Sequence, residues 1–340
     1  MIPQKAFICG CRGFSLTDEE ARFFARERPW GFILFKRNCD NPEQITALTA
    51  QLREAAGAPG APIFIDQEGG RVQRLQPPHW PKYPSGQAFA ELHAVDAESG
   101  ERAVYLAARL IAADLWPLGI DADCLPVLDV PVPGAHDVIG DRAYGRDPAV
   151  IAHLGGIAAS GLLAGGVLPV IKHIPGHGRA GADSHFELPV VTEPRAGLEA
   201  VDFAPFRALN TLPMAMTAHV VYTALDPDAP CSTSVSVIRD IIRGFIGFDG
   251  LLMSDDVSMN ALDGEIGDRT AACFAAGCDF VLHCNGNLEE MLAVAERAPV
   301  LEGLAEERAL RALSFRKAPT PFDAKAGHNE LRALMSRLSV

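Results

Sequence analysis

Short, uninterrupted runs of apolar residues recur along the chain, and several of them end in a charged or imidazole side chain. Continuous apolar runs of this length are typical of strands buried on both faces, as in a parallel sheet, whereas half-exposed strands alternate apolar and polar residues. The pattern therefore predicts eight buried parallel strands, at residues 6–10, 31–35, 62–66, 124–129, 167–173, 214–220, 250–256 and 280–285.

Helical patterns lie between most of these runs. Thr17-x-x-Glu20 has the spacing of a capping box and opens a helix, and Asn41-Pro42 opens another that Gly57 ends. Alternation of strand and helix eight times predicts an α/β fold, a (β/α)8 barrel over about residues 5–300 of a single domain, 1–340. The tail, about 302–340, predicts helices that pack outside the barrel. The other predicted helices span 99–116, 147–163, 197–209, 235–246, 266–276 and 288–297.

The composition limits the class of protein and its partners. Hydrophobic residues make up 48% of the chain and charged residues 21%, which excludes a disordered or collagen-like chain. The net charge of −13, without a cluster of Lys and Arg, predicts no nucleic-acid or membrane partner. Eight cysteines without a Cys-x-x-Cys pair, and an N-terminus without a signal-peptide pattern, predict reduced thiols in a cytoplasmic protein, which we expect to be a monomer.

One segment, 154–171, is uncharged over a membrane-spanning length. Five glycines and Pro169 interrupt it, and the Gly165-Gly166 pair is a typical helix stop. We therefore predict a helix that ends before a buried strand, and no membrane span.

Ionisable side chains follow five of the eight apolar runs. In a (β/α)8 barrel the C-terminal ends of all strands meet on one face, where active sites are built. The sequence therefore predicts an active site formed by some of these residues, which are Asp66, Asp129, Lys172, His173, His219, Asp255 and Asp256.

The segment 170–189, VIKHIPGHGRAGADSHFELP, permits three interpretations. Gly176-x-Gly178-x-x-Gly181 spells a dinucleotide-binding loop, but the required helix does not follow, because Pro189 and Pro194 interrupt the chain. A zinc site in a barrel hydrolase is a second interpretation, although His-x-His and His-Glu-x-x-His motifs are missing and Lys172 would place a cation beside the metal. Its candidate ligands are His173, His177, Asp183, His185, His219 and Asp255.

A catalytic loop is the third interpretation. Asp183 and His185 are two residues apart, so in an extended stretch their side chains point to one side. A carboxylate orients an imidazole and favours its protonated form, which gives a proton carrier near neutral pH. The loop glycines would let the segment swing. Lys172 and His173 suit charge-assisted hydrogen bonds to sugar hydroxyls or a carbonyl, and Asp255 suits a covalent nucleophile.

These residues resemble a known family. KHIPGHG followed by DSH, at 172–185, resembles the signature Lys-His-Phe-Pro-Gly-His-Gly…Asp-Ser/Thr-His of bacterial β-N-acetylhexosaminidases in glycoside hydrolase family 3. GFDGLLMSDDVSM, at 247–259, resembles that family's nucleophile segment. IDQEGGRVQRL (65–75), GFILFKRN (31–38) and GDRAYGRDP (140–148) match in order and position. The resemblance runs from about residue 5 to 300, with Ile174 where the family usually has Phe and Phe245 where a polar residue is more usual.

The resemblance implies a single (β/α)8 barrel without a cofactor that removes terminal, non-reducing β-linked N-acetylglucosamine from small carbohydrates. The reaction would proceed with retention through a covalent glycosyl-enzyme intermediate, and the favoured role is peptidoglycan recycling, on muropeptides that contain GlcNAc-1,6-anhydro-MurNAc. Carried onto this sequence, the family makes Asp255 the nucleophile, His185 the general acid/base and Asp183 its partner. It assigns sugar binding to Asp66, Arg74, Arg142, Lys172 and His173.

Two other functions stay open as alternatives, a metal-dependent barrel hydrolase and a non-catalytic sugar-binding protein. Among neighbouring residues, we expect Glu68 to hold Arg71 or an adjacent strand rather than to join the site, and we leave open whether Asp129 and His219 line the pocket. We expect surface or packing roles for the remaining histidines, which are His79, His93, His136, His153, His283 and His328.

Overall fold

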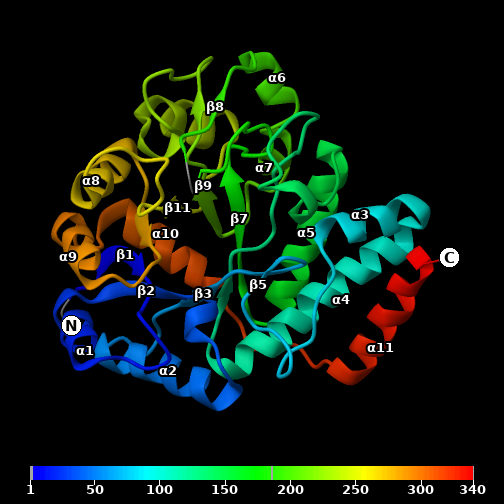
Figure 1. Ribbon diagram of the computed structural model, residues 1–340, viewed down its shortest axis with the longest axis horizontal. Coiled ribbons are helices and arrows are strands. Elements are labelled where there is room, and N and C mark those ends of the chain that lie inside the picture. The colour runs from blue at the N-terminus through cyan, green and yellow to red at the C-terminus, as the bar shows by residue number, and fades with distance from the viewer. Residues whose placement is uncertain (1–2, 185–186, 340) are drawn as a thin grey trace.

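The computed structural model describes residues 3–184 and 187–339, and its centre is a closed barrel of eight parallel strands (Figure 1). The strands follow one another around the barrel in chain order, and the last pairs with the first. Helices surround this ring, as a (β/α)8 barrel requires, so the predicted fold class is confirmed. The barrel strands are β1 (Lys5–Cys9), β2 (Pro29–Leu34), β3 (Ile63–Ile65), β6 (Ala122–Asp123), β7 (Leu168–Ile174), β9 (Met214–Thr217), β11 (Leu251–Asp256) and β12 (Phe280–His283).

Seven of the predicted apolar runs overlap these strands, and the run at 124–129 does not. Strand β6 is only Ala122–Asp123, two residues earlier than predicted. Pro126 has no N–H with which to continue a regular ladder. The segment still runs beside β7, because Val170 N donates to Leu125 O (3.0 Å) and Leu128 N donates to Lys172 O (2.8 Å).

Six of the outer helices match the predicted ranges closely. The capping box is present, since Glu20 N donates to Thr17 Oγ1 (3.2 Å) and Thr17 N donates to Glu20 Oε2 (3.0 Å). Helix α5 ends at Gly165, as predicted, and β7 follows. Among the described helices, none is both long and apolar enough to cross a bilayer. The six helices are α1 (Asp18–Glu27), α2 (Pro42–Ala55), α4 (Ala97–Leu115), α5 (Pro148–Ala164), α8 (Ile266–Ala276) and α9 (Leu288–Arg297).

Other elements differ from the predictions or were not predicted. The range 197–209 forms two short helices, α6 (Arg195–Ala200) and α7 (Ala204–Ala208), and Pro205 lies in the first turn of the second, where its missing N–H costs nothing. The range 235–246 is a wider π-helix, η5 (Val237–Phe245). The unpredicted elements are α3 (Gly86–Val95), the hairpin β4 (Gln67–Gly69) and β5 (Val72–Gln73), the pair β8 (Val190–Val191) and β10 (Val221–Tyr222), and the short 3-10 helices η1 (Lys36–Asn38), η2 (Trp116–Leu118), η3 (Gly140–Arg142), η4 (Cys231–Thr233) and η6 (Ser336–Ser339).

The two C-terminal helices cover different parts of the barrel. Helix α11 (Ala324–Met335) packs outside α4, as predicted (Figure 1). Helix α10 (Gly303–Ser314) lies instead across the N-terminal end of the barrel, where Ala309 and Ala312 join the interior cluster. Two aromatic side chains of that cluster, Trp30 and Phe280, have ring centroids 4.5 Å apart. The barrel is therefore closed at its N-terminal end, which leaves the C-terminal end for a ligand.

Candidate active site

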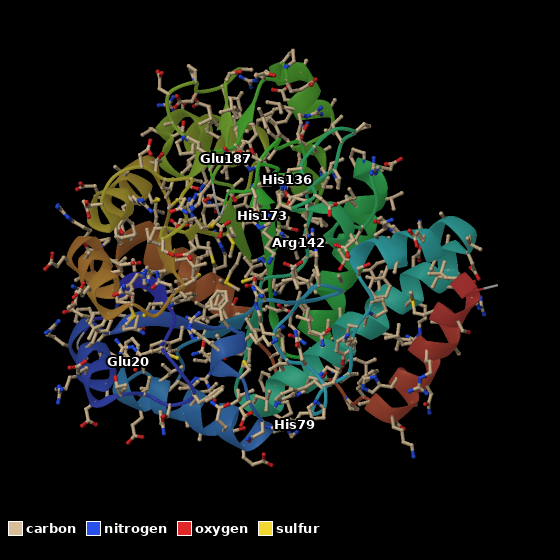
Figure 2. All side chains as sticks on the ribbon, in the orientation of Figure 1. Glu20, His79, His136, Arg142, His173 and Glu187 are labelled. Carbon is tan, nitrogen blue, oxygen red and sulfur yellow. The ribbon has the colours of Figure 1, made fainter. Side chains whose placement is uncertain are left out.

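The C-terminal ends of the strands surround a cavity of about 300 Å³. Arg142 and His173 lie near the centre of the ring in Figure 2, where the cavity is. Six of the eight predicted site residues line it together, namely Asp66, Arg74, Arg142, Lys172, His173 and Asp255. The cavity is also lined by Ile33, Phe35, Arg37, Glu68, Val72, Met216, Asp256, Met259, Leu282, Cys284 and Asn285.

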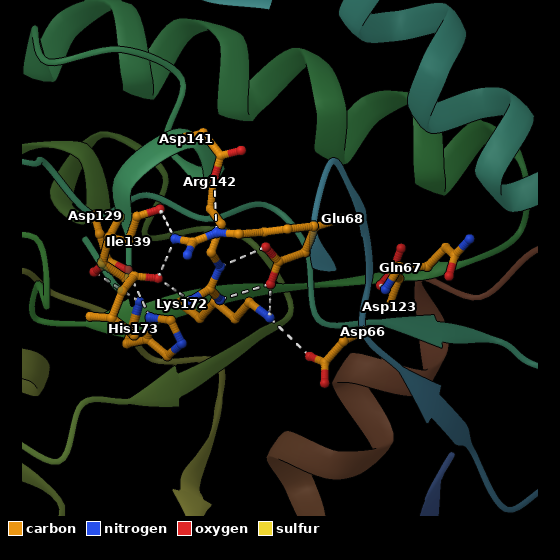
Figure 3. Close-up of polar contacts among 12 residues, drawn as sticks. Asp66, Gln67, Glu68, Asp123, Asp129, Ile139, Asp141, Arg142, Lys172 and His173 are labelled. Atoms are coloured by element: carbon orange, nitrogen blue, oxygen red, sulfur yellow. Dashed lines mark hydrogen bonds and ion pairs between the residues drawn. The ribbon is translucent and has the colours of Figure 1, made fainter. Parts of the chain in front are cut away.

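Two carboxylates and three cations form one network in this cavity, and Figure 3 shows the part made by Asp66, Glu68, Arg142 and Lys172. Lys172, on β7, lies with its Nζ 2.9 Å from Asp66 Oδ1 and 2.5 Å from Glu68 Oε1. Arg142, on η3, donates through Nε and Nη2 to the two oxygens of Glu68, at 2.9 and 2.8 Å. Arg74 donates to Asp66 Oδ2 at 2.9 Å. Each buried charge is therefore paired with at least one opposite charge.

The network sets the protonation of its members. Burial alone would raise the pKa of Asp66, but the nearby charges of Lys172 and Arg74 outweigh it and hold that pKa well below its usual range. Burial likewise opposes ionisation of Glu68, and Arg142 with Lys172 overcomes it, lowering the pKa of Glu68 to about 2. The two carboxylates raise the pKa of Lys172 against the effect of its burial. All three groups are therefore charged near neutral pH.

The prediction for Glu68 is wrong. Glu68 does not hold Arg71, which instead forms an ion pair with Asp141 (2.8 Å), and it lines the cavity through its contacts with Arg142 and Lys172. The sequence carried a signal for this placement, because Asp66 and Glu68 are two residues apart and side chains at that spacing in extended backbone face the same side. Their intervening neighbour, Gln67, opens the unpredicted hairpin β4–β5.

Asp129 and His219 lie behind the cavity rather than in its lining. Asp129 is buried beneath His173, accepting from His173 Nδ1 through Oδ2 (2.7 Å) and from the backbone N–H of His177 through Oδ1 (2.6 Å). It thereby fixes the orientation of the His173 imidazole, which faces the cavity. His219 contacts the backbone oxygen of Asp256 through Nε2 (3.1 Å), so it supports the end of β11 from behind.

The two acidic residues at the end of β11 have different surroundings. Asp255 lines the cavity, and its Oδ1 accepts the backbone N–H of Asp256 at 2.8 Å. The Asp256 carboxylate accepts the backbone N–H groups of Ser258 (3.0 Å) and Cys284 (3.1 Å), which ties the following loop to β12. The assignment of Asp255 as nucleophile stays a prediction, and the contacts of Asp256 give it a structural role in holding the loop.

The predicted acid/base pair lies only partly in the described residues. His185 is outside them. Asp183 is described, but it is not among the residues that line the cavity, and its backbone oxygen accepts from Glu187 N at 3.1 Å. The chain just before His185 is attached to the site region, because Ser184 Oγ lies 3.2 Å from Nε2 of the buried His177. The roles of Asp183 and His185 stay predictions.

Packing or backbone conformation requires glycine at two of the three loop positions, and the swing of the loop stays a prediction. A Cβ added to Gly178 would lie 2.2 Å from Val130 O, and Gly176 has a φ of +144°. Only Gly181 has open space around its Cα. Arg179 also anchors this segment through an ion pair with the buried Asp202 (3.0 Å). The first half of the loop is therefore a packed part of the fold.

Gly178→Ala is expected to destabilise the protein by about 1–3 kcal/mol, because the new methyl group meets backbone atoms that cannot rotate away. Gly181→Ala is the matched control, and we expect it to change stability by less than about 1 kcal/mol. Urea unfolding of both variants checks this. Equal stability of the two variants would mean that the close packing of Gly178 is not energetically important.

Within residues 3–184 and 187–339, no group of three or more His, Cys, Asp or Glu side chains is placed to hold a metal ion. The zinc interpretation of segment 170–189 therefore gains no support from the described part of the chain.

Comparisons with known proteins agree with this geometry. Residues 13–314 match the glycosyl hydrolase family 3 N-terminal domain. The chain is 40% identical over 277 residues to a beta-hexosaminidase of Aromatoleum aromaticum, covering 80% of this chain and 77% of the relative. It is similar to the crystal structure of native NagZ from Neisseria gonorrhoeae, with a TM-score of 0.85, 32% identity, and coverage of 98% of this chain and 97% of the other. The same values hold for NagZ from that organism in complex with N-trifluoroacetyl-D-glucosamine.

Proposed function

Because the chain belongs to glycosyl hydrolase family 3 and is a glycoside hydrolase of the β-hexosaminidase type, we propose that it is a retaining enzyme that removes terminal, non-reducing β-linked N-acetylglucosamine. Its proposed substrates are muropeptides containing GlcNAc-1,6-anhydro-MurNAc, in peptidoglycan recycling. The observation that carries this proposal is the convergence of Asp255 with five predicted sugar-binding residues on one cavity at the C-terminal end of the barrel. The complex of a similar protein with N-trifluoroacetyl-D-glucosamine supports the class of sugar.

The cavity has the donors and acceptors that a pyranose needs. The ionised carboxylate of Asp66 accepts from sugar hydroxyls, and the cations of Arg74, Arg142 and Lys172 donate to them, each through charge-assisted hydrogen bonds. Part of the remaining wall is apolar and suits the C–H faces of the ring and an acetyl methyl group. This apolar lining consists of Ile33, Phe35, Val72, Met216, Met259 and Leu282.

In the proposed mechanism, the Asp255 carboxylate attacks the anomeric carbon as the glycosidic C–O bond breaks. His185 gives its proton to the departing oxygen, and Asp183 orients His185. Water then attacks the same carbon and releases Asp255, while His185 takes the proton from that water. Two displacements at one carbon give a product with the original β configuration.

The test begins with EDTA-treated protein and p-nitrophenyl β-N-acetylglucosaminide, with the configuration of the first-formed sugar followed by NMR. We expect hydrolysis to β-N-acetylglucosamine, and cleavage of GlcNAc-1,6-anhydro-MurNAc in preference to chitobiose. Activity that disappears with EDTA and returns with zinc would favour the metal-dependent hydrolase. Sugar binding without hydrolysis would favour the non-catalytic binding protein, and an α product would contradict retention.

His185→Ala is expected to slow cleavage of substrates with poor leaving groups by about a hundredfold or more, since these need a proton on the departing oxygen. The rate of cleavage of substrates with a 2,4-dinitrophenyl leaving group should fall much less, because that group leaves without protonation. His79→Ala is the matched control, because His79 lies at the periphery of the barrel, far from His173 in Figure 2. A loss of equal size for both leaving groups would contradict the assignment of His185 as the acid.

A further inference from the structure

Glu68 lies in the site but has no part in the proposed chemistry. Its side chain is only 3% exposed, and both of its oxygens are engaged, Oε2 by Arg142 and Oε1 by Arg142 and Lys172 (Figure 3). The pKa of Glu68, lowered to about 2, keeps it ionised through the whole neutral range. A carboxylate in this state does not deliver a proton, and both of its oxygens accept from cationic donors. Its role is therefore to hold other groups.

The hairpin that carries Glu68 holds the η3 loop at two points. Inside, Glu68 accepts the two parallel hydrogen bonds from Arg142. Outside, Arg71 of the same hairpin pairs with Asp141, the residue next to Arg142, at 2.8 Å and with 43% of each side chain exposed. Arg71 also donates to the backbone oxygens of Val138 (2.9 Å) and Ile139 (3.2 Å). The hydrogen bonds from Arg71 to backbone oxygens position the loop backbone, and the inner pair positions the guanidinium.

The inner pair also separates two cations. Arg142 and Lys172 both contact Glu68 Oε1, so the two positive groups are close neighbours with this oxygen between them. Lys172 has a second carboxylate, Asp66, whereas the ion pair described for Arg142 is the one with Glu68. Without the negative charge of Glu68, the guanidinium and the ammonium would repel each other in a buried place, and Arg142 would leave its position.

We propose that Glu68 is a positioning residue, which fixes Arg142 and Lys172 in the sugar-binding wall of the cavity and acts on the reaction only through them. The proposal rests on the proposed function, in which both cations bind the sugar. A carboxylate that accepts two parallel hydrogen bonds suits this positioning role, since it fixes the plane of the Arg142 guanidinium as well as its distance.

The test is a double-mutant cycle with Glu68→Gln, Arg142→Ala and the double variant, measured as kcat and KM on p-nitrophenyl β-N-acetylglucosaminide. We expect Glu68→Gln to lower kcat/KM by about a hundredfold, because glutamine presents one acceptor and an NH2 group to two cations and so misplaces them. The double variant should lose less than the product of the two single losses, because part of the effect of Glu68 passes through Arg142 and the rest through Lys172. Losses that multiply, or a Glu68→Gln variant with wild-type kinetics, would overturn the proposal.

Asp141→Asn is the matched control, because it removes the exposed ion pair between the same two segments, and we expect kcat/KM to stay within about threefold of the wild type. Circular dichroism and thermal unfolding show whether each variant is folded. If Glu68→Gln does not fold, Arg142→Lys carries the test: lysine keeps the charge but not the two parallel hydrogen bonds, so at least a tenfold loss is expected, and wild-type activity would overturn the proposal. Loss of the proposed function is a separate outcome, because the wild type would then be inactive or Asp255→Ala would be active.

Discussion

Asp255→Ala is expected to lower kcat for p-nitrophenyl β-N-acetylglucosaminide by about 10⁴-fold or more, a loss typical of removing a nucleophile. Alanine has no group that can form the glycosyl-enzyme bond, so the first displacement does not occur. Binding should change far less, because the sugar-binding cations and Asp66 stay in place. The measurement is steady-state kinetics with a titration of N-acetylglucosamine by calorimetry, which separates loss of chemistry from loss of binding.

Asp263→Ala is the matched control for this loss. Asp263 is an exposed carboxylate in the segment that follows β11, and its removal should leave kcat unchanged. Azide adds a second control, because this small anion fits where the carboxylate was and attacks the anomeric carbon directly. It should restore part of the activity of Asp255→Ala and give the α-glycosyl azide. Equal activity of Asp255→Ala and wild type would assign the nucleophile to another residue.

Lys172→Met is expected to destabilise the folded protein by about 3–5 kcal/mol at pH 7, the usual effect of removing one partner of a buried ion pair. Lys172 is buried and touches Asp66 and Glu68 at once, so its loss leaves two buried carboxylates with too little positive charge. Methionine retains most of the volume and the apolar stem, which confines the effect to the charge. Urea unfolding at pH 7 gives the difference in free energy.

The pH dependence of this difference has a definite sign. In the wild type the pKa values of Asp66 and Glu68 are lowered, so their stabilising effect is complete above the ordinary carboxyl values of about 4. It is lost as the pH falls toward the folded pKa of Glu68, about 2. Burial raises the pKa of both carboxyl groups, and in Lys172→Met less positive charge opposes that effect. Both groups therefore take up protons at a higher pH than in the wild type. The gap in stability between the two proteins should therefore narrow as the pH is lowered below about 5.

Arg102→Met is the control for this experiment, because Arg102 and Glu330 form an ion pair at the surface, with side chains 47% and 44% exposed. We expect it to change stability by less than about 1 kcal/mol and with little pH dependence between pH 5 and 7. A Lys172→Met variant that is as stable as Arg102→Met, or a gap that widens in acid, would show that the cavity network does not stabilise the fold through charge.

The sequence by itself determined the elements of this protein and the face on which its reactive groups gather. Burial on both faces of a strand leaves a continuous apolar run, and helix caps use residues within four positions, so both signals are local and can be read directly. Parallel strands then place every residue that follows them at the same end of the barrel. For this reason Asp66, Lys172 and Asp255, which are far apart in the chain, were predicted to meet and do line one cavity.

The tertiary structure decided which charges pair and which distant segments pack against one another. Glu68 pairs with Arg142, 74 residues away, rather than with the nearby Arg71, because a buried charge is paired by whatever opposite charge lies close in space. Gly178 is fixed by the backbone of Val130, and α10 closes the barrel from the far end of the chain. Such contacts depend on how distant segments are placed against one another, and no local pattern of residue types records that placement.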